Sequence, residues 1–301
     1  MPSKNLGYRA RTSGLVGWSV AALVACSAGA LAADAPATPE VTVTPIAPAG
    51  SLTPVAPPAP VAPVYFSATQ IDSIALLQPP PERGNDADKQ DLQAVLARQK
   101  AARSDGTLER AVGDAALSCR RVADALRPRG AEAVGVPGAA LPETLVSGVG
   151  AAALDFATRA ALQAAGAVGP PKLYWHRPRP YMQSQDVERR ADVAPDYPMA
   201  PELAQQRDVS AYPSGHTAFG TACAIVLSQM VPEQRAALFA RARLYADARL
   251  VVGAHYPTDL EAGRIVGSAA AAVMLQNHQF QEDLRHATTG LRAALGLPAS
   301  P

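Results

Sequence analysis

The chain has 301 residues, and its 27 lysines and arginines against 26 aspartates and glutamates give a formal net charge of +1. There is no basic excess to hold a nucleic acid backbone, and no glycine period that would suggest collagen. Its 3 cysteines are too few for a disulfide framework. The length allows one large domain or two small ones, and either can bury a core.

Residues 1–32 have the layout of a secretory signal peptide. They begin with three basic residues, Lys4, Arg9 and Arg11. An uncharged apolar stretch follows at 15–26, and Ala-Leu-Ala at 30–32 offers small residues for cleavage. A retained anchor needs about 20 apolar residues, so we expect export to the periplasm. The stretch that ends at Cys26 also resembles a lipobox, and lipidation of Cys26 stays an alternative.

Residues 33–65 form a segment dominated by Pro, Ala, Val and Thr. Because proline fixes φ and removes a backbone donor, the segment is expected to be an extended and solvated spacer. A proline-rich ligand for a partner domain is the alternative.

From residue 66 to 301 the sequence predicts a single all-α domain. Apolar residues recur at helical spacing, while strand alternation and Asn-Gly hairpin signals are nearly absent. Helices are expected at 86–103, 107–126, 141–167, 217–230, 233–252, 259–276 and 280–295. The apolar run at 263–276 is only about half a bilayer in length, so we expect a core helix and no integral membrane span.

Three segments concentrate the residues that carry chemistry, and they lie at 172–180, 210–217 and 249–259. They read Lys-Leu-Tyr-Trp-His-Arg-Pro-Arg-Pro, Ser-Ala-Tyr-Pro-Ser-Gly-His-Thr and Arg-Leu-Val-Val-Gly-Ala-His-Tyr-Pro-Thr-Asp. Taken singly, they are typical of a solvated turn, a helix cap and a surface pair. Taken together, they supply what phosphoryl transfer demands.

An entering phosphate brings about two negative charges. Lys172, Arg179 and Arg249 can neutralise them, and arginine offers a planar fork to paired oxygens. Ser214 can donate a hydroxyl bond, and Gly215 lets its backbone N–H approach an oxygen closely. A helix that begins directly after these two residues would add a dipole that favours anions.

Two histidines in these segments suit a nucleophile and a general acid. Asp259 can accept a bond from one ring nitrogen of His255, which fixes the tautomer and leaves the other nitrogen to attack phosphorus. In-line geometry then requires His216 on the opposite side, where it protonates the leaving oxygen. An acidic pH optimum follows as a hypothesis, because His216 must be protonated while His255 is neutral.

The order and spacing of these residues resemble the three-part motif of the type 2 phosphatidic acid phosphatase superfamily. The closer resemblance is to the bacterial class A nonspecific acid phosphatases, and it covers roughly residues 75–290. The motif is Lys172-x6-Arg179-Pro180, then Pro213-Ser214-Gly215-His216, then Arg249-x5-His255-x3-Asp259. The resemblance implies an all-helical fold around a central bundle. It also implies metal-independent hydrolysis of small phosphomonoesters without a cofactor, inhibition by vanadate and a homodimer.

The resemblance further implies a role for each matched residue. His255 becomes a phosphohistidine and His216 is the acid. The phosphate is bound by Lys172, Arg179, Ser214, Gly215, His216 and Arg249. Ala248 stands where the family usually has serine, which questions one hydrogen bond at the edge of the site. Arg177 is a weaker candidate than Arg179 for the motif arginine, because only Arg179 has the family spacing from Lys172.

Other functions stay as alternatives. A vanadium haloperoxidase shares the same oxyanion cradle, although such enzymes are usually longer and no halide site is marked here. An integral lipid phosphatase needs serial spans of about 20 apolar residues, but a soluble or tethered enzyme can still act on lipid phosphates. A metal hydrolase lacks its His-Glu-x-x-His run, and a non-catalytic phosphate-binding protein needs no nucleophile. The balance between phosphatase and phosphotransferase activity is open.

Two further groups of residues have two readings each. Cys119 and Cys223 fall on expected core helices, where export permits a disulfide and two buried thiols are an equal alternative. Tyr174, Trp175 and Tyr212 flank the motifs, and they either stack on an aromatic leaving group or pack in the core.

Overall fold

The computed structural model describes residues 64–130, 140–189 and 210–299. The expected signal peptide, Cys26 and the spacer up to residue 63 lie outside these residues. Within them every regular element is a helix, apart from one isolated bridge between Pro178 and Ser210. The all-α expectation is confirmed. No helix in the described part has the combined length and apolarity needed to cross a bilayer.

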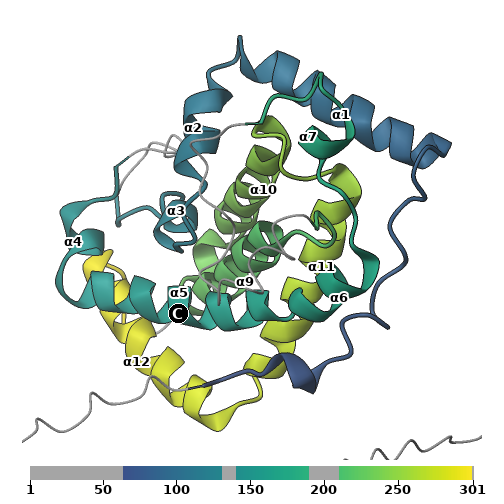
Figure 1. Cartoon of the computed structure of the whole chain (residues 1–301). Coiled ribbons are helices and arrows are strands. Elements are labelled where there is room, and N and C mark those ends of the chain that lie inside the picture. Colours follow the sequence, from purple (N-terminus) through teal and green to yellow (C-terminus); the bar gives the residue numbers. More distant parts are fainter. Residues whose placement is uncertain (1–63, 131–139, 190–209, 300–301) are drawn as a thin grey trace, which may run out of the picture. The chain divides into compact units, whose positions relative to one another are not determined.

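Figure 1 shows the helices of the described residues. The first half holds η1 (Ala68–Gln70), α1 (Asp86–Ala102), α2 (Thr107–Gly113), α3 (Arg120–Ala123), α4 (Glu143–Val146), α5 (Gly148–Gly166), α6 (Gly169–Trp175) and α7 (Pro180–Gln183). The second half holds α9 (Gly215–Met230), η2 (Pro232–Gln234), α10 (Arg235–Val251), α11 (Pro257–Met274) and α12 (His278–Ala294).

Helix α9 is the central helix of this bundle, and it packs against α5, α10, α11 and α12 (Figure 1). Only Ile225 and Gln229 of its residues are not buried, which fits a sequence of small and apolar side chains. Helix α11 lies especially close. A Cβ added at Gly263 would lie 2.3 Å from the Ser214 carbonyl oxygen, so glycine there brings α11 against the start of α9.

Two expected helices are each divided in the structure, and the prediction of continuous helices there was wrong. The stretch 107–126 forms α2 and α3 with a connector between them, residues 114–119. The carbonyls of Ala115 and Ala116 accept bonds from side chains of α9 and α10, so the connector serves tertiary contacts in place of helical ones. The stretch 141–167 breaks at Gly148, whose φ of 53° is left-handed.

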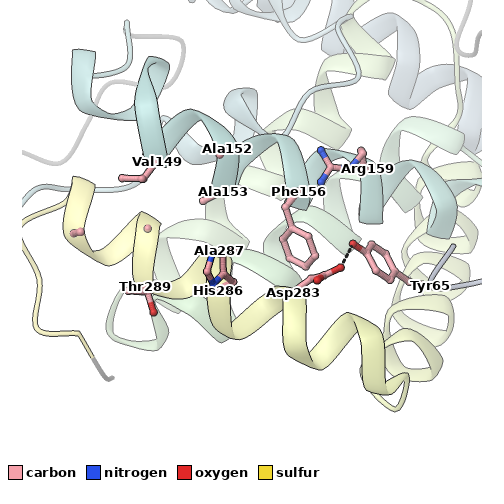
Figure 2. A pocket seen from close by; sticks show the side chains of 12 residues that line it. Tyr65, Val149, Ala152, Ala153, Phe156, Arg159, Asp283, His286, Ala287 and Thr289 are labelled. Carbon is pink, nitrogen blue, oxygen red and sulfur yellow. Dashed lines mark hydrogen bonds between the residues drawn. The ribbon is translucent and has the colours of Figure 1, made fainter. Parts of the chain in front are cut away.

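The packed part of the chain begins at Tyr65, which the sequence placed in the spacer. Tyr65 is buried, and its ring contacts Phe156 and Phe280 edge to face at 5.8 and 5.3 Å. It lines a groove of about 580 Å³ between α5 and α12, where its hydroxyl donates to Asp283 at 2.6 Å (Figure 2). Burial, followed by this bond, raises the pKa of Tyr65 to about 12.

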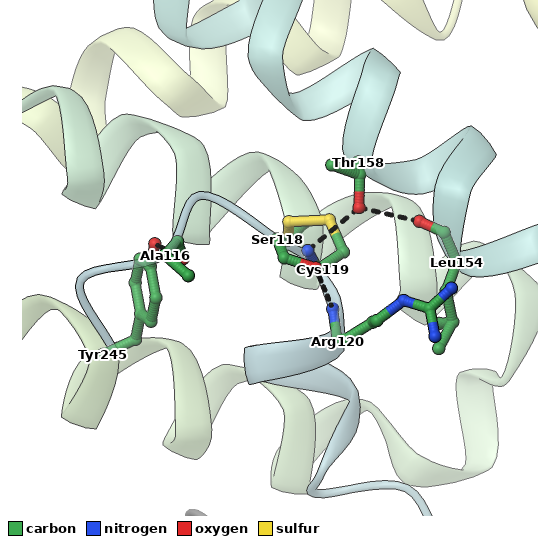
Figure 3. The surroundings of a disulfide bond; sticks show 8 residues. Ala116, Ser118, Cys119, Arg120, Leu154, Thr158 and Tyr245 are labelled. Carbon is green, nitrogen blue, oxygen red and sulfur yellow. Dashed lines mark hydrogen bonds between the residues drawn. A yellow bond between two sulfur atoms is a disulfide. The ribbon is translucent and has the colours of Figure 1, made fainter. Parts of the chain in front are cut away.

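A disulfide joins Cys119 to Cys223 (Figure 3). Of the two alternatives for these cysteines, a disulfide and two buried thiols, the structure shows the disulfide. Cys119 is the N-cap of α3, and its backbone N–H donates to the Thr158 hydroxyl of α5 at 3.0 Å. Cys223 lies in the middle of α9. The bond therefore anchors the end of the connector to the central helix.

Removing this bond with the double variant Cys119→Ala/Cys223→Ala is expected to lower the free energy of unfolding by about 2–4 kcal/mol. The bond closes a loop across a sequence separation of 104 residues, which restricts the unfolded chain. Denaturant unfolding with and without reductant measures the effect. Reductant should destabilise the parent and leave the double variant unchanged; equal stability of the two oxidised proteins would contradict the prediction.

Candidate active site

The three motif segments are joined by backbone hydrogen bonds. The Ala211 N–H donates to the Arg177 carbonyl at 2.7 Å, which links the first segment to the second. The Ser214 N–H donates to the Asp259 carbonyl at 2.9 Å, which links the second to the third. Residues far apart in the sequence are thereby brought into one site.

His255 lies directly before α11, and Asp259 lies in the first turn of that helix. The Nδ1 of His255 is 3.3 Å from Asp259 Oδ2, and the Nε2 of His255 is 3.3 Å from Arg179 Nη1. A guanidinium can only donate, so Nε2 carries the lone pair and Nδ1 carries the proton. Nε2 is therefore the nitrogen that can attack an electrophile. The turn before it needs Gly253, whose φ is 72° and whose added Cβ would lie 2.5 Å from a carbonyl oxygen.

Asp259 is fully buried and charged. Burial by itself raises the pKa of this carboxyl, but the bond to His255 and the charge of Arg177 outweigh burial and hold the pKa below its ordinary value. The Tyr256 N–H also donates to Oδ2 at 2.8 Å. The carboxylate can therefore stabilise a positive charge on the His255 ring.

Arg177, which the motif spacing did not single out, contacts the buried carboxylate of Asp259. Its Nη1 donates to Asp259 Oδ1 at 2.7 Å, and its Nη2 donates to Asp91 and Asp88 of α1 at 2.8 and 3.2 Å. Burial alone would lower the pKa of this guanidinium, but the charges of Asp259 and Asp91 raise it. The only sequence signal was the acidic pair on α1, which by itself reads as a solvated helix face.

Each of the three expected phosphate-binding cations is buried and donates to a backbone carbonyl. Lys172 Nζ donates to Ser210 at 2.8 Å, and Arg179 Nη1 donates to Ala254 at 2.9 Å. In the same way Arg249 Nη2 donates to the carbonyl of Ala111 in α2 at 3.0 Å. These bonds fix the direction of the three cationic side chains, which suits the recognition of an anion.

Helix α9 begins at Gly215 with Ser214 as its N-cap, two residues before the predicted start of this helix at 217. The Ser214 Oγ accepts from the Thr217 N–H at 3.2 Å and from the Thr217 hydroxyl at 3.1 Å. A Cβ added at Gly215 would meet only Val168 Cγ2, at an ordinary 3.6 Å. Packing against the described residues therefore leaves room for a side chain at this position.

His216 is held by the connector. Its Nε2 lies 2.9 Å from the Ala115 carbonyl, which can only accept, so Nε2 carries a proton. If His216 exchanges a proton with a ligand, Nδ1 is therefore the nitrogen that can do so. The ring stacks on Tyr245 at 5.7 Å, and the Tyr245 hydroxyl donates to the neighbouring Ala116 carbonyl at 2.9 Å (Figure 3).

The connector is itself clamped by Arg241 of α10. This guanidinium donates to both oxygens of Asp114, at 3.0 and 2.6 Å, and to both oxygens of Asp124, at 2.8 and 3.0 Å. All three side chains are buried. The carbonyl that holds His216 thus follows directly after a doubly bonded carboxylate.

Ala248, Trp175 and Tyr212 also lie near the motif segments, and each packs against other side chains of the protein. Ala248 is buried in a small apolar cluster with Ala102 and Val251. Trp175 and Tyr212 pack edge to face at 5.2 Å, and Tyr174 is exposed. The core-packing reading therefore suits Trp175 and Tyr212.

Two carboxyl groups at this site have lowered pKa values, so acid should destabilise the fold. Burial raises the pKa of Asp88, but hydrogen bonds from Gly84, Gln183 and Arg177 bring it below its ordinary value of 3.8. The pKa of Asp259 is also below its ordinary value. Stability from such groups is present above their unfolded pKa and is lost as pH falls through the folded one. We expect Tm to change little down to about pH 5 and to fall below about pH 4. Circular dichroism melts across this range measure it, and a Tm that rises on acidification would contradict it.

Comparison with known proteins decides the family. The model of the PAP2 superfamily matches residues 151–283, which include all three motif segments. A non-specific acid phosphatase of Providencia stuartii is 33% identical over 225 residues, which cover 72% of this chain and 79% of that protein. The chain belongs to the PAP2 superfamily. The resemblance to its acid phosphatase members is thereby confirmed.

Two further relatives match this chain over shorter stretches. An acid phosphatase of Zymomonas mobilis is 29% identical over 129 residues, which cover 42% of this chain and 45% of that protein. A non-specific acid phosphatase of Salmonella typhimurium is 41% identical over 78 residues, which cover 26% of this chain and 31% of that protein. The roles of individual residues in the PAP2 domain stay predictions.

Proposed function

We propose that this protein is an acid phosphatase that hydrolyses small phosphomonoesters through a phosphohistidine at His255, without a metal ion. The enzyme class follows from its family, so the chain is a phosphoric monoester hydrolase. The observation that supports the mechanism best is the protonation pattern of His255, with Nδ1 on Asp259 and a lone pair on Nε2 facing Arg179. Among the described residues no cluster of three or more His, Cys, Asp or Glu is arranged to hold a metal ion.

The first step forms a bond between His255 Nε2 and phosphorus and breaks the ester P–O bond. His216 gives its Nδ1 proton to the leaving oxygen, so the product is a neutral alcohol. The ring of His255 becomes positive, and the Asp259 carboxylate stabilises that charge. Lys172, Arg179 and Arg249 hold the equatorial oxygens, on which the transition-state charge is spread.

The second step breaks the N–P bond. Water loses a proton to His216 and attacks phosphorus, so that inorganic phosphate leaves and both histidines return to their starting forms. An alcohol that replaces this water would make the protein a phosphotransferase. Vanadate, which adopts the geometry of the pentacovalent transition state, should inhibit both reactions.

The site recognises the phosphoryl group rather than the alcohol, since the cations and Ser214 all belong to the phosphate cradle. Broad specificity follows. Residues 1–32 support a periplasmic location, with attachment through a lipidated Cys26 as the alternative. The homodimer stays a prediction from the resemblance.

Hydrolysis of 4-nitrophenyl phosphate by the purified protein at mildly acidic pH, with excess EDTA, tests this function. The expected result is a rate that EDTA does not change and vanadate abolishes. An inactive protein, a loss of activity with EDTA, or peroxide-dependent bromide oxidation with bound vanadate would each overturn the proposal.

A further inference from the structure

Arg177 joins the catalytic pair His255 and Asp259 to helix α1. One guanidinium contacts three carboxylates: Asp259 at 2.7 Å, Asp91 at 2.8 Å and Asp88 at 3.2 Å. The side-chain exposure of the arginine is 4%, and that of the three acids lies between 0% and 5%. Such a cluster persists in the interior only because each charge has a partner.

The contacts of Arg177 leave the Asp259 carboxylate no freedom to rotate. Oδ2 accepts from His255 Nδ1 and from the Tyr256 N–H, and Oδ1 accepts from Arg177. Arg177 is itself fixed, because its guanidinium lies 3.9 Å from the centre of the Tyr256 ring and donates to Thr258 Oγ1 at 2.7 Å. The plane of the His255 ring is therefore set by a chain of contacts that begins on α1.

The charges around Arg177 also indicate that it fixes the state of Asp259. Without Arg177, three buried carboxylates would face one another, and one of them would have to take up a proton. A protonated or rotated Asp259 would no longer hold the Nδ1 proton of His255. Arg179, by contrast, contacts the opposite nitrogen of the same ring, so the two arginines act on opposite sides of His255.

We propose that Arg177 is a positioning residue for the nucleophile His255 and acts through Asp259. The inference rests on the proposed function and deepens it. Arg177 does not touch the phosphate, which is bound by Lys172, Arg179 and Arg249. Its loss should therefore slow phosphoryl transfer far more than it weakens phosphate binding.

Steady-state kinetics of Arg177→Gln test this proposal. We expect kcat to fall about 100-fold, the size of effect that follows a misplacement of about 1 Å at a reacting atom. The inhibition constant of inorganic phosphate should change less than about threefold, because uniform binding is retained. Arg177→Lys should restore part of kcat, since lysine keeps the charge but cannot bridge the three acids.

Arg292→Gln is the matched control. Arg292 is another buried arginine, and it donates to Met230, Pro298 and Glu233, none of which belongs to a motif segment. It should lose stability but keep kcat when assayed well below its Tm. If Arg177→Gln does not fold, Arg177→Lys and Asp91→Asn replace it, and both should lower kcat. A rise in KM and in the phosphate inhibition constant with kcat unchanged, or a kcat loss no larger than that of the control, would overturn the proposal.

The Nδ1–H resonance of His255 in nitrogen-15-labelled protein gives a readout that needs no turnover. It should be present in the parent and lost or shifted in Arg177→Gln and Asp91→Asn, while Arg292→Gln leaves it unchanged. If the parent hydrolyses no ester, the proposed function fails, and this resonance alone decides the role of Arg177. An identical resonance in the parent and the Arg177 variants would overturn the inference.

Discussion

Replacement of His255 by alanine is expected to lower kcat for 4-nitrophenyl phosphate by at least about 10³-fold, as removal of a covalent nucleophile does in other enzymes. His255 Nε2 forms the bond to phosphorus, and Arg179 cannot replace it because a guanidinium has no lone pair. The fold should survive with a lower Tm, since alanine leaves a cavity in a buried site. Assays at mildly acidic pH with excess EDTA measure the loss.

His278→Ala and His286→Ala are the matched controls for this variant. Both histidines are exposed on α12, and His286 lies on the rim of the groove in Figure 2. Neither change should alter kcat by more than about twofold. Retention of most activity by His255→Ala would show that another group attacks phosphorus.

Replacement of Arg241 by glutamine is expected to cost about 3–5 kcal/mol of unfolding free energy, the largest loss of stability that we predict. The change leaves Asp114 and Asp124 buried without the guanidinium that bridges them. It also loosens the connector, whose Ala115 carbonyl holds His216. Denaturant unfolding and kcat measured at low temperature should both register the change.

An exposed arginine gives the control for Arg241. Arg264 pairs with Glu261 on the surface of α11, where the two side chains are 53% and 57% exposed. Exposed ion pairs contribute about 0–1 kcal/mol, so Arg264→Gln should change stability little. Equal stability losses for Arg241→Gln and Arg264→Gln would contradict the role given to the buried clamp.

The site could be predicted from the sequence where chemistry depends on local spacing. His255 and Asp259 are four residues apart, and the structure places their side chains in contact. Ser214 before a run of small apolar residues indicated a helix start, and α9 begins there. The family motif added Lys172, Arg179 and Arg249, all of which are buried.

The rest depended on contacts between elements far apart along the chain. Arg177 contacts Asp88 and Asp91 of α1, and the spacing within the first segment cannot predict these contacts. The break after Gly113 arises because the connector carbonyls bind side chains of α9 and α10, and a periodic apolar pattern cannot report that. The Cys119–Cys223 bond depends on the distance between two helices, so the sequence left it open.

Trapping of the phosphorylated enzyme tests the central claim most directly. The protein is mixed with a phosphomonoester, quenched with alkali under conditions that preserve phosphohistidine, digested and analysed by mass spectrometry. The account predicts a phosphoryl group on His255 that is absent from His255→Ala and disappears as turnover ends. Active enzyme with no phosphoryl group on His255 at any time of quenching, or with one on another residue, would contradict it.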